Sequence, residues 1–321
     1  MSSSPKIIFY GTPEFAVPSL DILVKNNYQI IAVITVPDKP AGRGQKIVAS
    51  PVKEYAHAHD LVVLQPVNLK DENFIQQLRE LKPDLQVVVA FRMMPEVVWK
   101  MPKLGTFNLH ASLLPQYRGA APINWAIING EKETGVTTFF LQQEIDTGKI
   151  IFREKTYIGE KETAGQLHDK LMHLGAQLVL KTVNAVSTDN YPLVEQDTLE
   201  KGVILKTAPK LTKINCRIDK HKTAQEIDNF VRGLCPYPAA IAEFYNDNGL
   251  SLIIKIYNVT AETASHDKKP GLIETDHKSS LKIYLKDGWI YINELLVAGR
   301  NRIHVKDFLN GFKMTGNWEM Q

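Results

Sequence analysis

The chain has 321 residues, of which 44% are hydrophobic and 23% charged, and its formal net charge is +3. This composition is typical of a globular protein with one large or two smaller domains, and it excludes disordered and membrane-spanning chains. The two cysteines, Cys216 and Cys235, are too few for a disulfide framework and lack metal-ligand spacing, so we expect no metal site. No secretory leader and no apolar run of about 18 residues is present, which predicts a cytoplasmic protein.

The N-terminal half alternates short apolar runs with amphipathic segments, as a parallel sheet covered by helices requires. Lys6–Tyr10 is predicted to be the first strand, and Thr12 to cap a helix that begins at Pro13. Ile30–Val36 would complete a βαβ unit, and the apolar run Leu85–Ala90 is predicted as a further buried strand. The first turn contains only one of the three glycines of a dinucleotide site, which excludes a dinucleotide-dependent dehydrogenase.

A loop rich in glycine and proline, PDKPAGRGQK, follows the second strand and spans Pro37–Lys46. Glycine and proline by themselves indicate an irregular connection. The loop is also basic, and Arg43 stands between two glycines, where the chain can approach a phosphate or a base edge closely. Arg43 is therefore a candidate nucleic-acid contact.

The stretch Thr106–Pro122, TFNLHASLLPQYRGAAP, is the candidate active site. Alternation along a strand would place Asn108, His110 and Ser112 on one face. A Leu-Leu-Pro sequence and a basic turn at Arg118 follow, at the end of a strand, where open α/β sheets bind their ligands. A single histidine near an apolar strand is more often structural. An Asn–His pair followed by a polar turn, however, is hard to bury unless every polar atom is paired.

Asp146 lies in an Asp-Thr-Gly turn between two β-rich runs, Gly135–Leu141 and Lys149–Phe152. Its spacing alone is typical of a turn residue that bonds its own backbone. The apolar residues of Glu162–Ser187 recur with helical spacing, which predicts one long amphipathic helix. Tyr191–Thr207 lacks periodicity, and we interpret it as a linker.

The pattern after this linker changes to short β-like segments with turn signals, which predict a small barrel of the oligonucleotide-binding (OB) type. Residues 209–321 contain 16 Lys and Arg against 13 Asp and Glu. The difference of +3 equals the formal net charge of the whole chain. Such an excess is a weak nucleic-acid signal, and a solvated lysine-rich surface explains it equally well. We predict a catalytic domain at 1–190, a linker at 191–208 and an OB-like domain at 209–321.

Several of these segments together resemble the formyltransferases that use 10-formyltetrahydrofolate. The longest is NLHASLLPQYRGAAPINWAIINGEKETGVT, followed by IDTGKI, which contains Asp146. The segments KIIFYGTPEFAVPSL, PDKPAGRGQK and APKLTKINCRID extend the similarity over nearly the whole chain. The resemblance implies an α/β, Rossmann-like formyltransferase domain followed by a smaller β-barrel domain, with 10-formyltetrahydrofolate as the formyl donor and no metal.

The resemblance gives three side chains catalytic roles. Asn108 would donate its amide to the oxyanion of a tetrahedral intermediate, and His110 would move protons or help to hold that oxyanion. Asp146 would orient the imidazole and favour its protonated form. The implied folate-binding residues lie in two loops: Ser112, Leu113, Leu114, Pro115, Phe91 and Met93. Arg92 and Met93 stand where a glycine and an aliphatic residue are more usual, so for that loop only the location is carried over.

The acceptor implied by the resemblance is initiator methionyl-tRNA, bound by a monomer without any membrane. Arg43 would contact the tRNA, together with the basic C-terminal domain. Formyl transfer to a small amine such as a sugar nucleotide or glycinamide ribotide is a first alternative, although the extra C-terminal third argues against the glycinamide enzyme. A 10-formyltetrahydrofolate hydrolase is a second. A pure RNA-binding module would leave the Asn–His pair unexplained.

Overall fold

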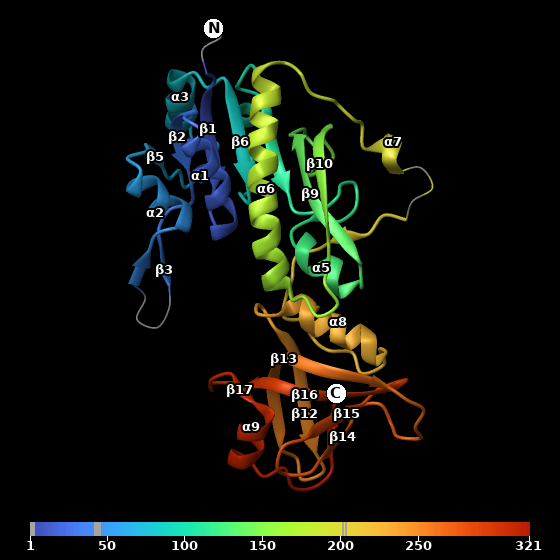
Figure 1. The fold of residues 1–321 in the computed structure, drawn as a ribbon. Helices are drawn as coiled ribbons and strands as arrows, with labels where there is room; N and C mark the ends of the chain where they lie inside the picture. The colour runs from blue at the N-terminus through green and yellow to red at the C-terminus, as the bar shows by residue number, and fades with distance from the viewer. Residues whose placement is uncertain (1–3, 42–45, 201, 203) are drawn as a thin grey trace. The chain divides into compact units, whose positions relative to one another are not determined.

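The computed structural model describes residues 4–41, 46–200, 202 and 204–321, and it contains two compact units (Figure 1). The first, which we call the sheet unit, comprises residues 1–119, 134–157 and 168–207. The second, the barrel unit, comprises residues 120–133, 158–167 and 208–321. Among the described residues, no helix combines the length and the apolar character that crossing a membrane would demand.

The sheet unit is built on a seven-stranded sheet in the order β10-β9-β7-β6-β1-β2-β5. Strand β1 pairs in parallel with β2 and β6, β6 pairs in parallel with β7, and β9 runs antiparallel to β7. The strand bounds are β1 Lys6–Gly11, β2 Gln29–Ile34, β5 Val63–Leu64, β6 Leu85–Val89, β7 Thr106–His110, β9 Glu133–Phe140 and β10 Ile150–Tyr157. The predicted Rossmann-like α/β sheet is thereby confirmed.

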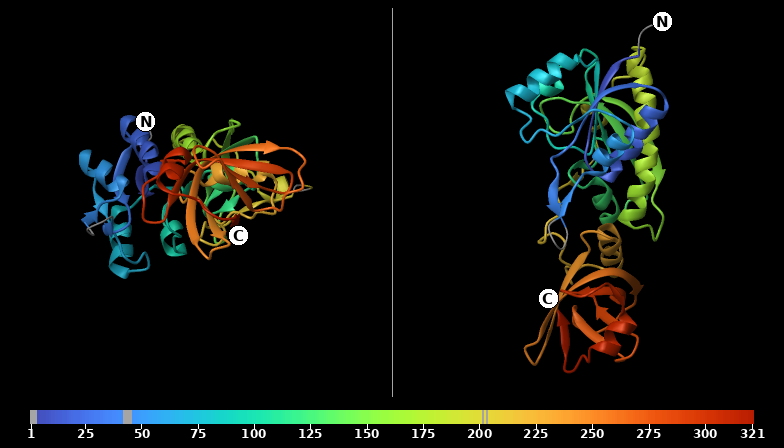
Figure 2. Two further views of the ribbon diagram at one scale, coloured as in Figure 1. Left: turned by 90° about the horizontal axis from the view of Figure 1, so that it is seen from below. Right: turned by 90° about the vertical axis from the view of Figure 1, so that its left-hand side faces the viewer.

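Helices cover this sheet, which explains why its central strands are apolar throughout. They are α1 Val17–Lys25, α2 Pro51–Ala58, α3 Glu72–Leu81, α4 Glu96–Trp99 and α6 Ala164–Ser187. Figures 1 and 2 show α6 lying along the strands. A Cβ atom at Gly175 would be only 2.6 Å from Cδ2 of Leu109, so the helix backbone lies directly against β7.

Two of these helices begin at a capping side chain, and a predicted cap of a third helix is absent. Ser50 caps α2 and Asp71 caps α3, each by accepting a hydrogen bond from a backbone amide of the first turn. The predicted cap at Thr12 is wrong, because a 3-10 turn, Glu14–Ala16, precedes α1 and puts the helix start beyond its reach. The Thr12 hydroxyl is buried, and none of the described residues hydrogen-bonds to it.

The Gly- and Pro-rich connection is more regular than its composition indicates. Its two arms, β3 Lys39–Ala41 and β4 Lys46–Val48, pair antiparallel. The base of this hairpin is fastened by Asp38, which forms an ion pair of 2.6 Å with Lys53 and accepts a hydrogen bond from Gln65. The hydrogen bond from Lys53, which has the largest effect, and that from Gln65 lower the pKa of the Asp38 carboxyl. Arg43 itself lies outside the described residues.

In the barrel unit, six described strands form a ring in the order β13-β12-β18-β14-β15-β16, which the pairing of β13 with β16 closes. The short β17 adds to the edge of β16. The bounds are β12 Ala240–Asn246, β13 Ser251–Thr263, β14 Leu272–Thr275, β15 Leu281–Tyr284, β16 Gly288–Val297, β17 Ile303–His304 and β18 Trp318–Met320. The predicted barrel is confirmed.

Three helices pack on or beside this barrel within the same unit. In α8, Ala224–Leu234, Thr223 and Glu226 form a reciprocal capping box. A neighbouring helix, α5 Pro122–Ile128, contacts α8 through a 2.8 Å hydrogen bond from the Asn124 amide to the carbonyl of Gly233. Helix α9, Val305–Gly311, adds Phe308 and Leu309 to the barrel core.

Candidate active site

Strand β7 positions the Asn–His pair. Asn108 is partly exposed, whereas His110 retains 6% of its surface, and their spacing of two residues puts both on the same face. Throughout the described part of the chain, the Asn108 side chain has no hydrogen-bond partner, so its amide is available to a ligand. An amide with free donors beside a titratable imidazole can stabilise a developing negative charge next to a proton acceptor.

The two nitrogens of the His110 ring have different neighbours. Nε2 lies 2.9 Å from the carbonyl oxygen of Tyr117, and because a carbonyl only accepts, Nε2 must carry a proton. Nδ1 lies 3.9 Å from Oδ2 of Asp146. The edge-to-face packing of the Phe139 ring holds the imidazole from a third side. Nδ1 is therefore the ring nitrogen that can gain or lose a proton during a reaction.

Asp146 comes from the turn between β9 and β10, 36 positions after His110. Its backbone is left-handed, with φ +57°, and its Oδ2 accepts a 3.0 Å hydrogen bond from the amide of Gly119. The turn lies tightly against β9, since a Cβ atom at Gly148 would be 1.7 Å from the carbonyl oxygen of Phe140. The structure thus brings together the three side chains for which the resemblance implies catalytic roles, and those roles stay predictions.

Ser112 does not share the face of Asn108 and His110, and that expectation is wrong. Strand β7 ends at His110, and the Ser112 hydroxyl turns back to donate a 2.6 Å hydrogen bond to the carbonyl of Gln116. Leu114 is fully buried against Phe139 and Ile150, so only its backbone could meet a ligand. The hydroxyl of Thr137, on β9, bonds to this loop at both Ser112 and Leu114.

The loop Phe91–Pro95 follows β6, the strand next to β7, so both candidate folate loops leave the same edge of the sheet. The Phe91 ring packs edge-to-face on Tyr10, at 5.5 Å between centroids. Arg92 donates to the carbonyls of Pro66 and Val67. The Met93 side chain is 73% exposed and faces solvent. The binding roles predicted for Phe91, Met93 and residues 112–115 stay predictions.

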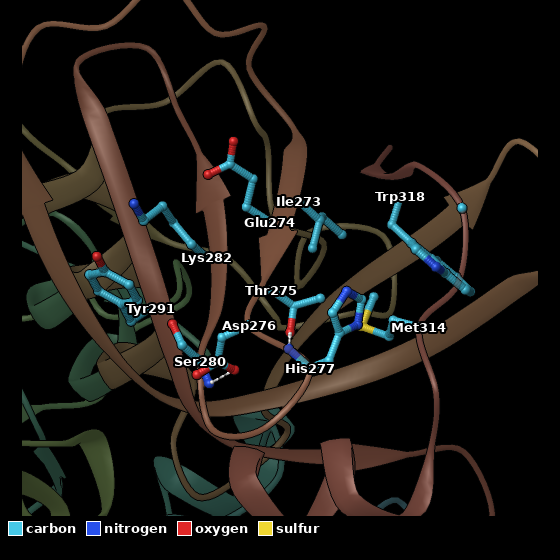
Figure 3. A pocket seen from close by; sticks show the side chains of 11 residues that line it. Ile273, Glu274, Thr275, Asp276, His277, Ser280, Lys282, Tyr291, Met314 and Trp318 are labelled. Carbon is cyan, nitrogen blue, oxygen red and sulfur yellow. Dashed lines mark hydrogen bonds between the residues drawn. The ribbon is translucent and has the colours of Figure 1, made fainter.

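A pocket of about 500 Å³ lies on the barrel unit (Figure 3). Figure 3 shows Lys282 and Tyr291 next to each other at one end and His277, Met314 and Trp318 at the other. The Lys282 ammonium lies 4.6 Å from the ring centre of Trp289 and 5.4 Å from that of Tyr291. Burial opposes the charged form of Lys282, but hydrogen bonding and electrostatic interaction with the Tyr291 and Tyr284 phenols outweigh it, so the pKa of Lys282 is raised.

Two residues that contact the candidate site, Thr137 and Gln196, were not predicted from the sequence. Thr137 is one of several β-branched residues on a strand, and only the register that pairs it with His110 reveals its position. Gln196 lies in the aperiodic segment read as a linker, yet it is 1% exposed and contacts the Asp146 turn. No sequence signal marks either residue. Within the described ranges, no group of three or more metal-binding side chains was found.

The formyl transferase family model matches residues 5–183, and the model for the formyl transferase C-terminal domain matches residues 210–313. This chain belongs to the formyl transferase family. Among its curated relatives in that family, the methionyl-tRNA formyltransferase of Bacteroides fragilis is 50% identical over 98% of both chains. The methionyl-tRNA formyltransferase of Flavobacterium johnsoniae is 52% identical over 95% of this chain and 96% of its own.

Solved members of the formyl transferase family share the fold at lower identity. WlaRD, a sugar 3N-formyl transferase solved with dTDP and 5-N-formyl-THF, has a TM-score of 0.64 at 22% identity and covers 94% of this chain and 100% of its own. An N-formyltransferase from Helicobacter canadensis, in complex with folinic acid and dTDP-3-aminofucose, has the same TM-score at 24% identity, covering 90% and 98%. This chain is accordingly a transferase enzyme of the formyl transferase fold.

Proposed function

We propose that this enzyme transfers the formyl group of 10-formyltetrahydrofolate to the α-amino group of methionine on initiator Met-tRNA, as a cytoplasmic monomer. The observation that carries the proposal is that Asp146 approaches the His110 imidazole beside Asn108, whose side-chain amide has no hydrogen-bond partner among the described residues. Relatives at about half identity over 98% of the chain, which are named methionyl-tRNA formyltransferase, support the acceptor.

The chemistry needs an oxyanion donor and a proton carrier. When the neutral amine attacks the formyl carbon, a tetrahedral intermediate with an oxyanion forms, and the Asn108 amide is placed to donate to that oxygen. The attacking amine then loses a proton and the folate nitrogen must gain one before it leaves. Nδ1 of His110 carries out both transfers, since Nε2 is occupied by the Tyr117 carbonyl. The Asp146 carboxylate, 3.9 Å away, stabilises the imidazolium between the two steps.

The donor would bind between the two loops that leave neighbouring parallel strands. Loops after β6 and β7 meet at the carboxyl edge of the sheet, where open α/β folds bind ligands. Because Leu114 is buried and Met93 faces solvent, backbone groups of these loops supply most of the polar recognition. A rigid loop beside the oxyanion donor keeps the formyl carbon within about 3.5 Å of the attacking nitrogen.

The acceptor tRNA would use the barrel unit and the Pro37–Lys46 segment, whose sequence contains Arg43. Tyr284, Trp289 and Tyr291 surround Lys282, and such a combination of rings and one cation suits unpaired bases and phosphates. Arg43 is proposed to contact the tRNA through a phosphate or a base edge. A lost phosphate contact would lower the slope of log affinity against log salt by about one.

One measurement separates transfer from hydrolysis. The protein is incubated with 10-formyltetrahydrofolate and charged initiator tRNA, uncharged tRNA, a sugar-nucleotide amine or no acceptor, and both formylmethionyl-tRNA and tetrahydrofolate are quantified. The proposal requires rapid formation of both products with charged tRNA only. Tetrahydrofolate release at an equal rate without acceptor would establish a hydrolase, and turnover with the sugar amine would establish a small-amine transferase.

A second experiment tests the acceptor contacts. Arg43→Ala should weaken tRNA formylation, reduce its salt dependence and spare slow formyl transfer to water. Arg79→Ala, which removes an exposed arginine from α3, is the matched control and should change neither activity. If both activities of Arg43→Ala fall together, the hairpin supports the active site and does not contact tRNA.

A further inference from the structure

Within the segment 191–207, read from the sequence as a linker, residues 194–199 contact the sheet unit beside the Asp146 turn. Val194 exchanges two backbone hydrogen bonds with Ile150 at the start of β10, of 2.9 and 3.0 Å. Val194 and Leu199 also pack against the small cluster formed by Leu114, Phe139 and Ile150. Residues 194–199 are therefore held next to the candidate active site, and among the described residues of the segment Gln196 is the most buried side chain.

Gln196 uses its full hydrogen-bonding capacity. Its Nε2 donates to the carbonyl oxygens of Asp146 and Gly148, at 2.9 and 2.8 Å. Its Oε1 accepts from Nε and from a terminal nitrogen of Arg118, at 3.0 and 2.6 Å. A primary amide has two N–H donors and two acceptor positions, so every one is satisfied within a side chain that is 1% exposed.

Arg118 completes the arrangement around the same carbonyl. Its Nε also donates to the carbonyl of Asp146 at 3.1 Å, and its terminal nitrogen forms a 2.7 Å ion pair with Glu200. Two side chains from distant parts of the chain thus hold the backbone oxygen of Asp146, while the Gly119 amide holds its carboxylate. Because Asp146 has a left-handed backbone, which L-residues adopt at a cost, external contacts of this kind are needed to keep it there.

We propose that Gln196, together with Arg118, is a positioning residue that fixes the Asp146 carboxylate at the distance from His110 that the reaction needs. The assignment rests on the proposed function, because Gln196 acts only through the Asp146–His110 pair. It gives the aperiodic segment a role in the chemistry. A displacement of about 1 Å at a reacting group can lower a rate by about 100-fold, which sets the scale of the expected effect.

The test variant is Gln196→Glu, which keeps the shape and the acceptor toward Arg118 but removes both N–H donors. A carboxylate oxygen would then face the carbonyls of Asp146 and Gly148 and push the turn away. We expect kcat to fall by about 10-fold to 100-fold, with KM for both substrates within about twofold of wild type. Glu195→Gln is the matched control, because it exchanges the same two functional groups in the opposite direction at the neighbouring position. Glu195 forms an exposed ion pair with Lys149, so the kcat of this variant should match wild type.

A double-mutant comparison separates positioning from a general structural effect. If Gln196 works through Asp146, adding Gln196→Glu to Asp146→Asn should lower kcat no further than Asp146→Asn alone. Multiplying effects, or a near-normal kcat in folded Gln196→Glu, would overturn the proposal. Thermal unfolding of each variant identifies any that fail to fold, and Gln196→Asn then replaces Gln196→Glu, because it keeps both donors on a shorter arm.

A readout that needs no turnover distinguishes this proposal from the proposed function. The nitrogen chemical shifts of the His110 imidazole report which nitrogen carries a proton, and they should change in Gln196→Glu but not in Glu195→Gln. Unchanged shifts would count against positioning even if the enzyme formylates tRNA. Changed shifts in a protein that does not formylate Met-tRNA would leave the positioning intact and contradict the proposed function alone.

Discussion

The hydroxyl of Thr137 donates a 2.6 Å hydrogen bond to the carbonyl oxygen of Ser112, 25 positions earlier in the chain. The oxygen of the Thr137 hydroxyl in turn accepts a 3.1 Å hydrogen bond from the amide of Leu114. One fully buried side chain on β9 therefore ties both ends of the turn that follows the Asn–His strand. Because neither backbone group can reach water there, each depends on Thr137 for its partner.

Replacing Thr137 with valine should loosen this turn. Two buried backbone groups would lose their partner, which costs on the order of 1–3 kcal/mol each in the worst case, so the free energy of unfolding should fall by about 2 kcal/mol. KM for the folate donor should rise several-fold, because the turn forms part of the predicted donor site. Denaturant titration and steady-state kinetics measure the two effects. Thr137→Ser, which keeps the hydroxyl, should stay close to wild type.

Truncating either member of the Asn–His pair should abolish most of the activity without unfolding the protein. Asn108→Ala and His110→Ala are each expected to lower turnover by about 100-fold or more, through loss of the oxyanion donor and of the proton carrier. Circular dichroism should remain unchanged for Asn108→Ala, since its side chain is partly exposed. A variant with near-normal turnover would show that its residue has been given the wrong role.

Arg92 is expected to set the position of the loop that follows β6. Its guanidinium donates to the carbonyls of two successive residues, Pro66 and Val67, and lies 5.8 Å from the centre of the Phe91 ring. Arg92→Ala should raise KM for 10-formyltetrahydrofolate several-fold and leave kcat within about twofold, because no reacting group moves. Arg92→Lys should not rescue, since an ammonium cannot reproduce the planar fork. A selective fall in kcat would contradict this reading.

The stability of the sheet unit should depend on pH through Asp84. Its Oδ2 accepts a 2.9 Å hydrogen bond from the backbone amide of Lys6, and its Oδ1 lies 2.9 Å from the Lys103 ammonium. Both contacts lower the pKa of the Asp84 carboxyl in the folded protein, and the Lys6 hydrogen bond has the larger effect. A carboxyl with a lowered folded pKa stabilises the protein above its unfolded pKa of about 3.9, and this contribution is lost as the pH falls through the folded pKa.

Asp84→Asn should therefore lower the free energy of unfolding by about 1 kcal/mol at pH 7, a modest value because the ion pair is partly exposed. The difference from wild type should shrink below about pH 4 and vanish at the acid end. Chemical denaturation at a series of pH values checks this course. Asp267→Asn, at an exposed aspartate of the barrel unit, serves as the control. A difference that grew on acidification would refute the assignment.

Local signals predicted much of the fold, and pairing over long distances explains what they missed. The apolar runs of β1 and β6 were found because both strands are buried on two faces. Strands β14 and β18 were not predicted. They are only four and three residues long, and β18 finds both its partners elsewhere in the chain.

The candidate site was predictable as far as its residues lie in a long signature. Asn108, His110 and Asp146 were identified in that way, and the structure brings them together. Gln196 was not identified, because a glutamine in an aperiodic segment carries no period or turn signal. Its role depends on four hydrogen bonds to three residues that are distant in sequence, Arg118, Asp146 and Gly148. The face assigned to Ser112 failed because alternation was extended beyond the end of the strand at His110.

The order of the chain through the two units has a consequence for producing the barrel unit alone. Helix α5 and residues 158–167 belong to the barrel unit, although their neighbours along the chain on both sides belong to the sheet unit. A fragment that begins at residue 209 would lack the helix that contacts α8, including the partner of the Gly233 carbonyl. Such a fragment is therefore expected to unfold more easily than the barrel unit does in the full chain, because the α5 side of α8 would lose its packing and the Gly233 carbonyl its partner.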